Sequence, residues 1–532
     1  MTDQNIKTSL GEDGVLLATI DMPGRSMNVF SFELMDSIDW LITHANGDDR
    51  IKAVVINSAK KAFIAGADLV MVRMFTERAQ TDSHADLVGL CGRLGRIFRR
   101  LEKSRKPFVA AVDGLALGGG LELCLACHAR VASDRKGVLL GLPEIKLGLL
   151  PGAGGTQRLP RVVGARLGLD MLLIGNPVTA DVALECGLVD AVVPSAELLN
   201  AARAKALSLG STVKSWDQPD ACFHSGELRL GEAGAHVRVA DVLGLSDEQI
   251  NHYPAYRAIM DCVIDGWGRP LDAGLDKEMD IFVRLIQNPV AGNMIRGLFI
   301  DRQRSLKVLK DVTADDAVSV AADDERAAAL LRSTRAPLVS PEALAPGDVL
   351  LAIDSAQAHG GSVVVATLGG VVPAGDGLGD RCHSGVWVGP MTEHGRAVEV
   401  VFDRDATARD AALRVAAWLR AGAVLVTEGA SSQLARLAEV DAAAAATGSE
   451  ADDRILLVAL AAGAMWIAGD VPDVALFDSV CAVAGVVPSY TGGPLNYLRQ
   501  NDEASLRQRA MALGHAWPEG LSLVFSEHSR GD

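Results

Sequence analysis

The sequence has few of the features that mark exported or membrane proteins. Its eight cysteines are spread thinly over 532 residues, whereas disulfide frameworks are dense and belong to small exported domains. The N-terminal stretch MTDQNIKTSLGEDG lacks the apolar core of a signal peptide. The longest apolar run, Ile455 to Gly469, is shorter than a bilayer-spanning helix. We therefore expect a cytoplasmic protein with reduced thiols and no membrane insertion, in which this run forms a buried helix.

Positive charge is also scarce. The formal net charge is -16, and the chain contains no basic run whose binding would release counterions from nucleic acid. We therefore expect no nucleic-acid partner, although a local basic pocket for an anionic small molecule stays open. With 532 residues, of which 49% are hydrophobic, the chain is long enough for two to four domains, each with its own core.

The first 190 residues alternate between strand and helix patterns. Short β-branched runs bounded by turn residues predict buried strands, at Gly14–Ile20, Ile51–Asn57 and Phe108–Val112. Between the first two, Ser31 can cap a helix that ends near Gly47. Apolar residues from Leu87 recur at helical spacing and predict a second helix that ends at Lys106–Pro107. This alternation indicates a layered α/β domain.

The remainder of the chain has a different pattern. Residues 197–310 look mostly helical, and a polar, alanine-rich joint near 311–325 precedes a second alternation of strand and helix. Its strands are expected at residues 318–321, 337–340, 348–352 and 362–366. After about residue 405 we expect helix to the end. The predicted divisions are residues 1–196, 197–310, 311–404 and 405–532.

The stretch GGGLELCLACH, residues 118–128, supports two incompatible interpretations. Its end matches the C-x-x-C-H pattern of covalent haem attachment, but Cys124, Cys127 and His128 fall on a helix that looks fully buried. We therefore interpret both cysteines as small core residues. Its start places three glycines before Glu122, at a helix N-terminus where close backbone approach and the helix dipole favour an anion. Glu122 as a simple helix N-terminal charge is the alternative.

Two further glycine-rich turns accompany this stretch. The first is AFIAGADL, residues 62–69, and the second is GLPEIKLGLLPGAGGT, residues 141–156, which carries Glu144. Taken singly, each pattern is common in structural turns. Taken in order, AFIAGADL, VDGLALGGGLELCLAC, GLPEIKLGLLPGAGGTQRLPR and GLVDAVVP resemble the crotonase superfamily of enoyl-CoA hydratases and isomerases. The similarity covers roughly residues 12–195.

The resemblance implies a crotonase-like ββα spiral domain and a set of site residues. The N–H groups of Ala67 and Gly119 would form an oxyanion hole for a thioester carbonyl, and Glu122 and Glu144 would hold the catalytic water. Further substrate-binding residues are expected at Ala65, Gly66, Asp68, Leu69, Gly118, Pro143 and Gly152. No metal is expected. Two carboxylates kept close together can divide the acid and base roles, because burial and like charge push their pKa values apart.

Both glutamates are present, which favours an enoyl-CoA hydratase, a lyase acting on an acyl-CoA. The alternatives are an enoyl-CoA isomerase or another crotonase-type lyase and, from a different class, a non-catalytic acyl-CoA-binding scaffold. The resemblance also implies a homo-oligomer, and a thiolase-like or other β-oxidation partner. Acyl chain length and product stereochemistry cannot be predicted from these residues.

The second half resembles the multifunctional fatty-acid β-oxidation proteins, in which a 3-hydroxyacyl-CoA dehydrogenase follows the hydratase. The similar segments are YPAYRAIM from Tyr253, NMIRGLFIDRQ from Asn293 and VPSYTGGPLNY from Val487. The resemblance implies a shortened Rossmann-like domain followed by a helical C-terminal domain.

The residues for dehydrogenase chemistry are missing from this half. A dinucleotide site needs G-x-G-x-x-G after its first strand, but the expected strand runs into Ala322–Arg326, and the glycines of 375–379 look like a loop. In place of the family's His-Phe-Phe-Asn-Pro, Val386 replaces the histidine and Gly389 the asparagine, with His383 as a weak substitute. We therefore expect an inactive dehydrogenase remnant that does not bind NAD.

Overall fold

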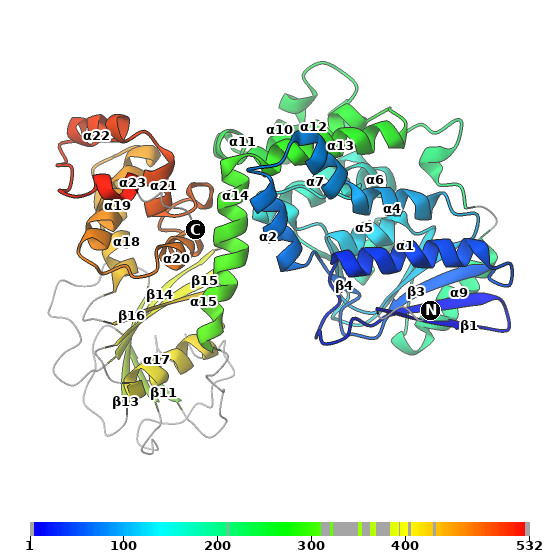
Figure 1. Ribbon diagram of the computed structural model, residues 1–532, viewed down its shortest axis with the longest axis horizontal. Coiled ribbons are helices and arrows are strands. Elements are labelled where there is room, and N and C mark those ends of the chain that lie inside the picture. Colours follow the sequence, from blue (N-terminus) through cyan, green and yellow to red (C-terminus); the bar gives the residue numbers. More distant parts are fainter. Residues whose placement is uncertain are drawn as a thin grey trace. The chain divides into compact units, whose positions relative to one another are not determined.

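The computed structural model divides into two compact units, Met1–Gly292 and Asn293–Asp532 (Figure 1). The residues that the structure describes are 5–209, 212–309, 320–322, 349–353, 362–368, 384–392, 394–402, 406–428 and 432–526. Residues 197–292 belong to the first unit. The finer division into four predicted parts stays a prediction.

A six-stranded sheet forms the centre of the first unit, in the order β1-β2-β3-β5-β7-β10. The strands are β1 Ile6–Leu10, β2 Val15–Ile20, β3 Ala53–Ser58, β5 Phe108–Val112, β7 Ala129–Ser133 and β10 Ala191–Val193. Only β1 and β2 pair antiparallel. Helix α9, Leu198–Ser208, covers one face with Leu198, Ala202 and Ala206. The three predicted strands are confirmed, and β-branched residues on both faces explain why they are buried.

A second, four-stranded sheet of very short strands lies in the same unit, in the order β4-β6-β8-β9. Its strands are β4 Ile64–Ala65, β6 Ala116–Leu117, β8 Leu139–Gly141 and β9 Val178–Thr179. The strands β4 and β6 are parallel, with Ala65 opposite Leu117. Each of these two strands is followed by a glycine, Gly66 or Gly118, with positive φ, a conformation that glycine adopts without steric cost.

Helices cover the sheets of the first unit. Helix α1, Phe32–Gly47, begins at the predicted cap Ser31, whose hydroxyl accepts the N–H of Leu34. The single helix predicted from Leu87 is wrong in detail, because it is divided at Gly92 into two helices. These are α3 His84–Cys91 and α4 Arg93–Glu102. Glycine is a poor helix former, which explains the break. Helix α4 packs against α1 on one side and against α5 (Gly119–Ala126) on the other (Figure 1).

Helices also dominate the chain after α9 in this unit, as predicted for this region. They are α10 Ala235–Leu243, α11 Asp247–His252, α12 Pro254–Gly266 and α13 Leu271–Ile286, and α14 Pro289–Ile295 begins in this unit and ends in the second. The helices α12 and α13 pack against each other and against α6, Gly155–Val163. This packing brings residues from the end of the first unit to the glycine-rich turn before α6.

The second unit contains a six-stranded sheet in the order β11-β12-β13-β14-β15-β16. Its strands are β11 Val320–Ala322, β12 Val349–Ile353, β13 Ser362–Leu368, β14 Ser384–Thr392, β15 Gly395–Phe402 and β16 Ala423–Glu428. All neighbours are parallel except β14 and β15. Helix α17, Ala406–Trp418, packs on β14 and β15. Strands predicted near 320, 349 and 362 are confirmed, whereas residues 337–340 lie outside the described residues.

The prediction of continuous helix after residue 405 is wrong, because β16 interrupts it. The strand contains Val424, Val426 and Thr427, and such β-branched residues fit a pleated, buried strand. Helices then follow, namely α18 Gln433–Ala446, α19 Ala451–Ile467, α20 Val474–Ala484, α21 Pro494–Gln500, α22 Glu503–Ala512 and α23 Ser522–Ser526. The longest apolar run lies in α19 and is mostly buried, as predicted. In the described part of the chain, no helix is both long and apolar enough to cross a bilayer.

Candidate active site

Two glycine turns of the first unit lie side by side. Because Ala65 is opposite Leu117 in the parallel pair β4·β6, the residues that follow, Gly66 and Gly118, are also neighbours. A methyl group placed on Gly118 would lie 3.7 Å from the Cα of Gly66. Ala67 and Gly119 follow at the next position of each turn. The predicted pair of backbone donors therefore comes from adjacent segments.

The N–H groups of Ala67 and Gly119 are available for a ligand. Phe30 donates its N–H to the carbonyl of Gly66 and accepts the N–H of Asp68, both at 2.8 Å. Because Gly66 and Asp68 both bond to Phe30, the N–H of Ala67 between them points away from Phe30. Gly119 is the first residue of α5, where N–H groups have no acceptor within the helix. Among residues 5–209, neither group donates to a protein oxygen.

Glu122 lies on the first turn of α5 and is 3% exposed. Its Oε1 accepts the N–H groups of Ala153 and Gly155, both at 2.8 Å. Burial raises the pKa of this carboxyl, while the two N–H donors and the charge of Arg158 act in the opposite direction. Its predicted burial is confirmed. The side chain does not cap its own helix, because its donors come from the turn that precedes α6.

Glu144 begins the short 3₁₀ helix η1, Glu144–Leu147, directly after Pro143. Its Oε1 would lie 2.7 Å from a methyl group on Gly118. Its Oε2 is buried and has no hydrogen-bond partner among the described residues. Burial, and secondarily the negative charge of Glu122, raise the pKa of Glu144 well above its ordinary value. Glu144 is therefore the member of the pair that is easier to keep protonated.

A third carboxylate, Glu278, was not predicted. It lies on α13 and is 1% exposed. Its Oε1 accepts the N–H of Gly154 at 2.6 Å, and its Oε2 accepts the N–H of Thr156 at 3.1 Å together with the hydroxyl of Thr156. Four consecutive N–H groups, those of residues 153–156, thus alternate between Glu122 and Glu278. Burial, as the largest cause, raises the pKa of Glu278 to about 8.

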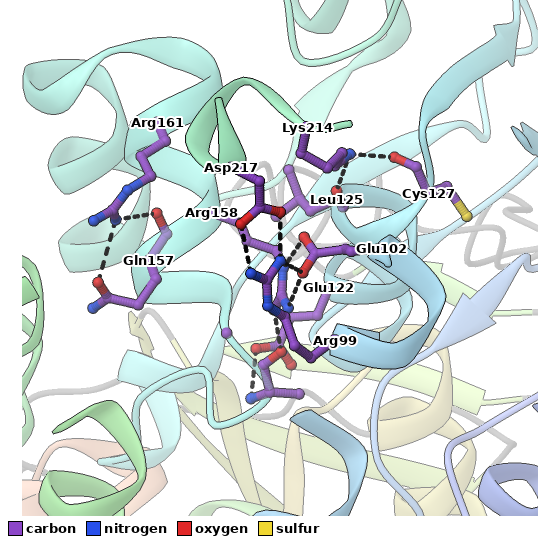
Figure 2. A network of polar contacts seen from close by, with 12 residues as sticks. Arg99, Glu102, Glu122, Leu125, Cys127, Gln157, Arg158, Arg161, Lys214 and Asp217 are labelled. Atoms are coloured by element: carbon purple, nitrogen blue, oxygen red, sulfur yellow. Dashed lines mark hydrogen bonds and ion pairs between the residues drawn. The ribbon is translucent and has the colours of Figure 1, made fainter. Parts of the chain in front are cut away.

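A buried ion pair supports the same turn (Figure 2). Arg158 and Glu102 have fully buried side chains, with two hydrogen bonds of 2.8 and 2.9 Å between them. Arg158 also donates to the carbonyl of Ala153 at 2.6 Å. Removing one partner of such a pair leaves an uncompensated buried charge, which is strongly destabilising. The turn that holds Glu122 is therefore fixed from two sides, by Glu278 and by Arg158.

The other predicted substrate-binding residues differ from one another in the contacts that they make. The N–H of Ala65 donates to the carbonyl of Asn28 at 2.9 Å. Asp68 is buried, caps α2 (Leu69–Arg78) through the N–H of Val70, and pairs with Arg25. Leu69 is the first residue of α2. A methyl group on Gly152 would lie 3.0 Å from the ring of Phe282. The carboxylate of Asp68 is therefore occupied by structural contacts.

The cysteines of the haem-like pattern are core residues, as predicted. Cys124 and Cys127 are fully buried, and burial raises the pKa of Cys127 to about 12. His128 accepts the N–H of Phe108 on its Nδ1 at 2.9 Å, and burial lowers its pKa to about 4. These thiols are shielded and protonated, so they do not suit covalent attachment of haem.

In the second unit, Val386 lies in β14 opposite Val400 and Ala366 and is 1% exposed. A valine at this position cannot transfer a proton. Gly389 follows in the same strand, whereas His383, residues 323–326 and residues 375–379 lie outside the described residues. The predicted dehydrogenase remnant stays a prediction.

Comparisons with known proteins agree with the geometry of the first unit. The family model described as "Enoyl-CoA hydratase/isomerase" matches residues 11–216. Proteins named "Fatty acid oxidation complex subunit alpha" are similar, one from Idiomarina loihiensis at 36% identity over 59% of this chain and 44% of its own length. The corresponding protein of Shewanella halifaxensis is 38% identical over 53% of this chain and 39% of its own. The chain thus spans less than half the length of these relatives.

Solved structures are also similar. The Pseudomonas aeruginosa protein DspI is 36% identical over 38% of this chain and 79% of its own, with a TM-score of 0.34. An enoyl-CoA hydratase from Mycobacterium avium subsp. paratuberculosis is 24% identical over 56% of this chain and 96% of its own, with a TM-score of 0.38.

Proposed function

Because residues 11–216 form a domain of the enoyl-CoA hydratase/isomerase family, we propose that this chain adds water to the double bond of an α,β-unsaturated acyl-CoA. One observation carries the proposal. Two neighbouring carboxyls have opposed environments, since Glu122 accepts two backbone N–H groups while Glu144 keeps a buried oxygen without a partner among the described residues. Such a pair suits simultaneous base and acid catalysis.

In the proposed reaction, the thioester carbonyl accepts hydrogen bonds from the N–H groups of Ala67 and Gly119. Attack at Cβ pushes the π electrons of the double bond toward this oxygen, which gains the negative charge of an enolate. Fixed donors aimed at a developing oxyanion contribute about 3 kcal/mol each to the transition state. The adjacency of the two turns, established by the β4·β6 register, supports this role.

The two glutamates then divide the proton transfers. Burial raises the pKa of Glu122, but two N–H donors and the charge of Arg158 oppose this rise and stabilise its ionised form. Glu122 takes a proton from water as the water oxygen bonds to Cβ. Glu144, whose pKa is raised by burial and by Glu122, donates its proton to Cα as the enolate electrons return. One proton is taken and one is given. Transfer of a proton from Glu122 to Glu144 restores the starting state.

The test uses the variants Glu122→Gln and Glu144→Gln. Glutamine keeps an acceptor oxygen for Ala153 and Gly155 but cannot take or give the proton, so the fold should persist. We expect kcat for hydration of crotonyl-CoA or longer enoyl-CoAs to fall by about 10²- to 10⁴-fold, followed as loss of enone absorbance. The exposed Glu185→Gln is the control. Near-normal turnover in either site variant would refute the assignment.

Isomerisation is distinguished in the same assay by offering a non-conjugated enoyl-CoA. A gain of enone absorbance without later loss indicates an isomerase, whereas binding without any change indicates a scaffold. We also propose a β-oxidation partner, because relatives are named as a subunit of a fatty acid oxidation complex, and co-purification tests this. The homo-oligomer stays a prediction. The cytoplasmic location stays a prediction.

For the second unit, we infer that NAD does not bind. The support is the valine in place of a histidine at Val386 and the absence of a glycine turn in the sequence after Val320, since a dinucleotide pyrophosphate needs close backbone approach there. Saturating NAD is expected to leave the melting temperature unchanged and to support no oxidation of 3-hydroxyacyl-CoA. A rise in melting temperature would contradict this.

A further inference from the structure

A cavity of about 280 Å³ opens in the first unit at the C-terminal end of α5, the end opposite to Gly119. Its lining includes His128, Arg130, Arg161, Lys214 and Trp216. Val213, which is 52% exposed, also lines the cavity, so the cavity reaches the surface. None of the proposed hydratase residues lies in this lining.

Three cationic side chains face this cavity, and each is nine-tenths buried. Lys214 donates to the carbonyls of Leu125 at 2.9 Å and Cys127 at 2.5 Å (Figure 2). Arg161 donates to the carbonyls of Gln157 and Gly266, both at 2.7 Å. Arg130 donates to the carbonyl of Leu188 at 2.7 Å. Most of the partners of these cations are therefore neutral carbonyls.

The cations exceed the negative charge that faces them. Among the described residues, the one carboxylate that forms an ion pair with any of the three is Asp190, at 3.6 Å from Arg130. The C-terminus of α5 adds about half a negative charge. Glu102 and Glu278 act from farther away, and Glu102 is already paired with Arg158. Burial without a full counter-charge is unfavourable, so an anion in the cavity would stabilise this arrangement.

Trp216 gives an independent indication of a ligand. It is 7% exposed, and its buried Nε1 has no hydrogen-bond partner in the described part of the chain. The indole N–H can only donate, and a buried donor without an acceptor costs about 1–3 kcal/mol. The ring of Trp216 lies 4.9 Å from Nζ of Lys214. Trp216 therefore marks a place next to Lys214 where a hydrogen-bond acceptor is missing.

We propose that this cavity binds a small oxyanion, the phosphate or carboxylate group of a small molecule. Arginine and lysine supply the charge-assisted donors that such groups prefer, and Trp216 supplies a neutral donor. The volume of about 280 Å³ exceeds that of one water, about 30 Å³, so an oxyanion fits with part of the molecule that carries it. This binding does not depend on the proposed hydratase activity.

The test is calorimetric titration of the full chain with sulfate, a dianion, in a chloride buffer at a pH about one unit below the pKa of about 7 that burial gives Lys214. We expect saturable binding at one site. Lys214→Met should weaken it by about tenfold, the equivalent of one charge-assisted hydrogen bond. Trp216→Phe, which keeps a ring but removes the N–H, should weaken it by about fivefold. The matched control is Lys136→Met, which removes an exposed charge and should leave the affinity unchanged.

Parallel titrations with inorganic phosphate and with acetate distinguish the two sources of the oxyanion. Tighter phosphate binding assigns a phosphate group, and tighter acetate binding assigns a carboxylate. If Lys214→Met does not fold, as judged by circular dichroism, Trp216→Phe carries the test alone. Absence of saturable sulfate binding, or equal affinity in the wild type and the folded cavity variants, would overturn the proposal.

Discussion

Glu278 illustrates how a residue with no proposed contact to the substrate can position one that has a proposed catalytic role. It holds the N–H groups of Gly154 and Thr156, while the N–H groups between and before them hold Glu122. Glu278 is a positioning residue in this arrangement. Without Glu278, the turn would keep the N–H groups of Ala153 and Gly155 that donate to Glu122, but it would no longer fix their direction.

We therefore predict that substitutions of Glu278 lower stability and activity to different degrees. Glu278→Ala leaves two buried N–H groups without acceptors and should lower the free energy of unfolding by about 2–4 kcal/mol. Glu278→Gln keeps one acceptor oxygen and should cost less. In both variants kcat should fall more than KM changes, because a misplaced Glu122 affects the transition state. Urea unfolding and hydratase kinetics measure these effects.

The exposed Glu232→Ala controls for simple loss of a carboxylate and should behave like the wild type. If Glu278→Ala unfolds like the wild type, or changes KM alone, Glu278 does not position the turn.

Sequence reasoning singled out Glu122 and Glu144 as candidate site residues but did not single out Glu278, and the difference has a physical cause. Both predicted glutamates stand next to glycine turns, and glycines mark where backbone approaches a ligand. Glu278 lies on a helix among ordinary amphipathic residues. It is far along the sequence from the turn that it holds. Only the packing of α13 against α6 reveals its role.

At the scale of elements, the close approach of β6 to η1 makes Gly118 irreplaceable. We predict that Gly118→Ala lowers kcat by about 10²-fold, because the added methyl group would lie 2.7 Å from Oε1 of Glu144 and would displace that carboxyl. Its φ of 54° and ψ of -126° lie in a region that other residues rarely adopt, so alanine adds strain of about 1–3 kcal/mol to the folded state.

Gly187→Ala is a matched control, since Gly187 has a φ of 75° and nothing within 4 Å of the added methyl group. It should show the same type of strain in thermal unfolding but keep its activity. Equal losses of activity in the two variants would mean that backbone strain, and not the contact with Glu144, is responsible.

Element boundaries were predictable where local chemistry decides them. The strand β5 matches the predicted Phe108–Val112, because a buried parallel strand is a continuous apolar run between turn residues. The strand β16 was missed, because alanine- and leucine-rich segments surround it and favour helix locally. Its pairing with β15 is a tertiary effect that overrides this local preference.

At the scale of the whole molecule, the two units were not equally predictable. The ordered glycine motifs predicted the fold of the first unit, and the family match at residues 11–216 agrees with this, whereas the roles of the site residues stay predictions. In the second unit the strands at 349–353 and 362–368 were expected, but no motif there defines a site. Which charged side chains are buried, by contrast, could not be predicted from the sequence. Lys214, Glu278 and Asp478 come from unrelated parts of the chain, and only the complete fold buries them.

These buried groups should make stability depend on pH in two opposite directions. The folded-state pKa values of Glu278, about 8, and Asp478, about 7, lie above their ordinary values of 4.5 and 3.8. At these two carboxyls the folded protein therefore holds more protons than the unfolded chain between pH 4 and 8. These groups lower stability as pH rises through that range. Lys214 does the reverse, since burial lowers its pKa from 10.5 to about 7.

The Lys214 contribution can be isolated with Lys214→Met. Between pH 7 and 10.5 the unfolded wild type holds a proton that the folded wild type has lost, so its stability gains with pH by at most about 1.4 kcal/mol per unit. Methionine does not titrate, and the variant lacks this gain. We therefore predict that the free energy of unfolding of the variant minus that of the wild type, from urea unfolding, falls steadily from pH 7 to 9.5. Lys136→Met should track the wild type, and a pH-independent difference for Lys214→Met would show that Lys214 keeps its proton in the folded protein.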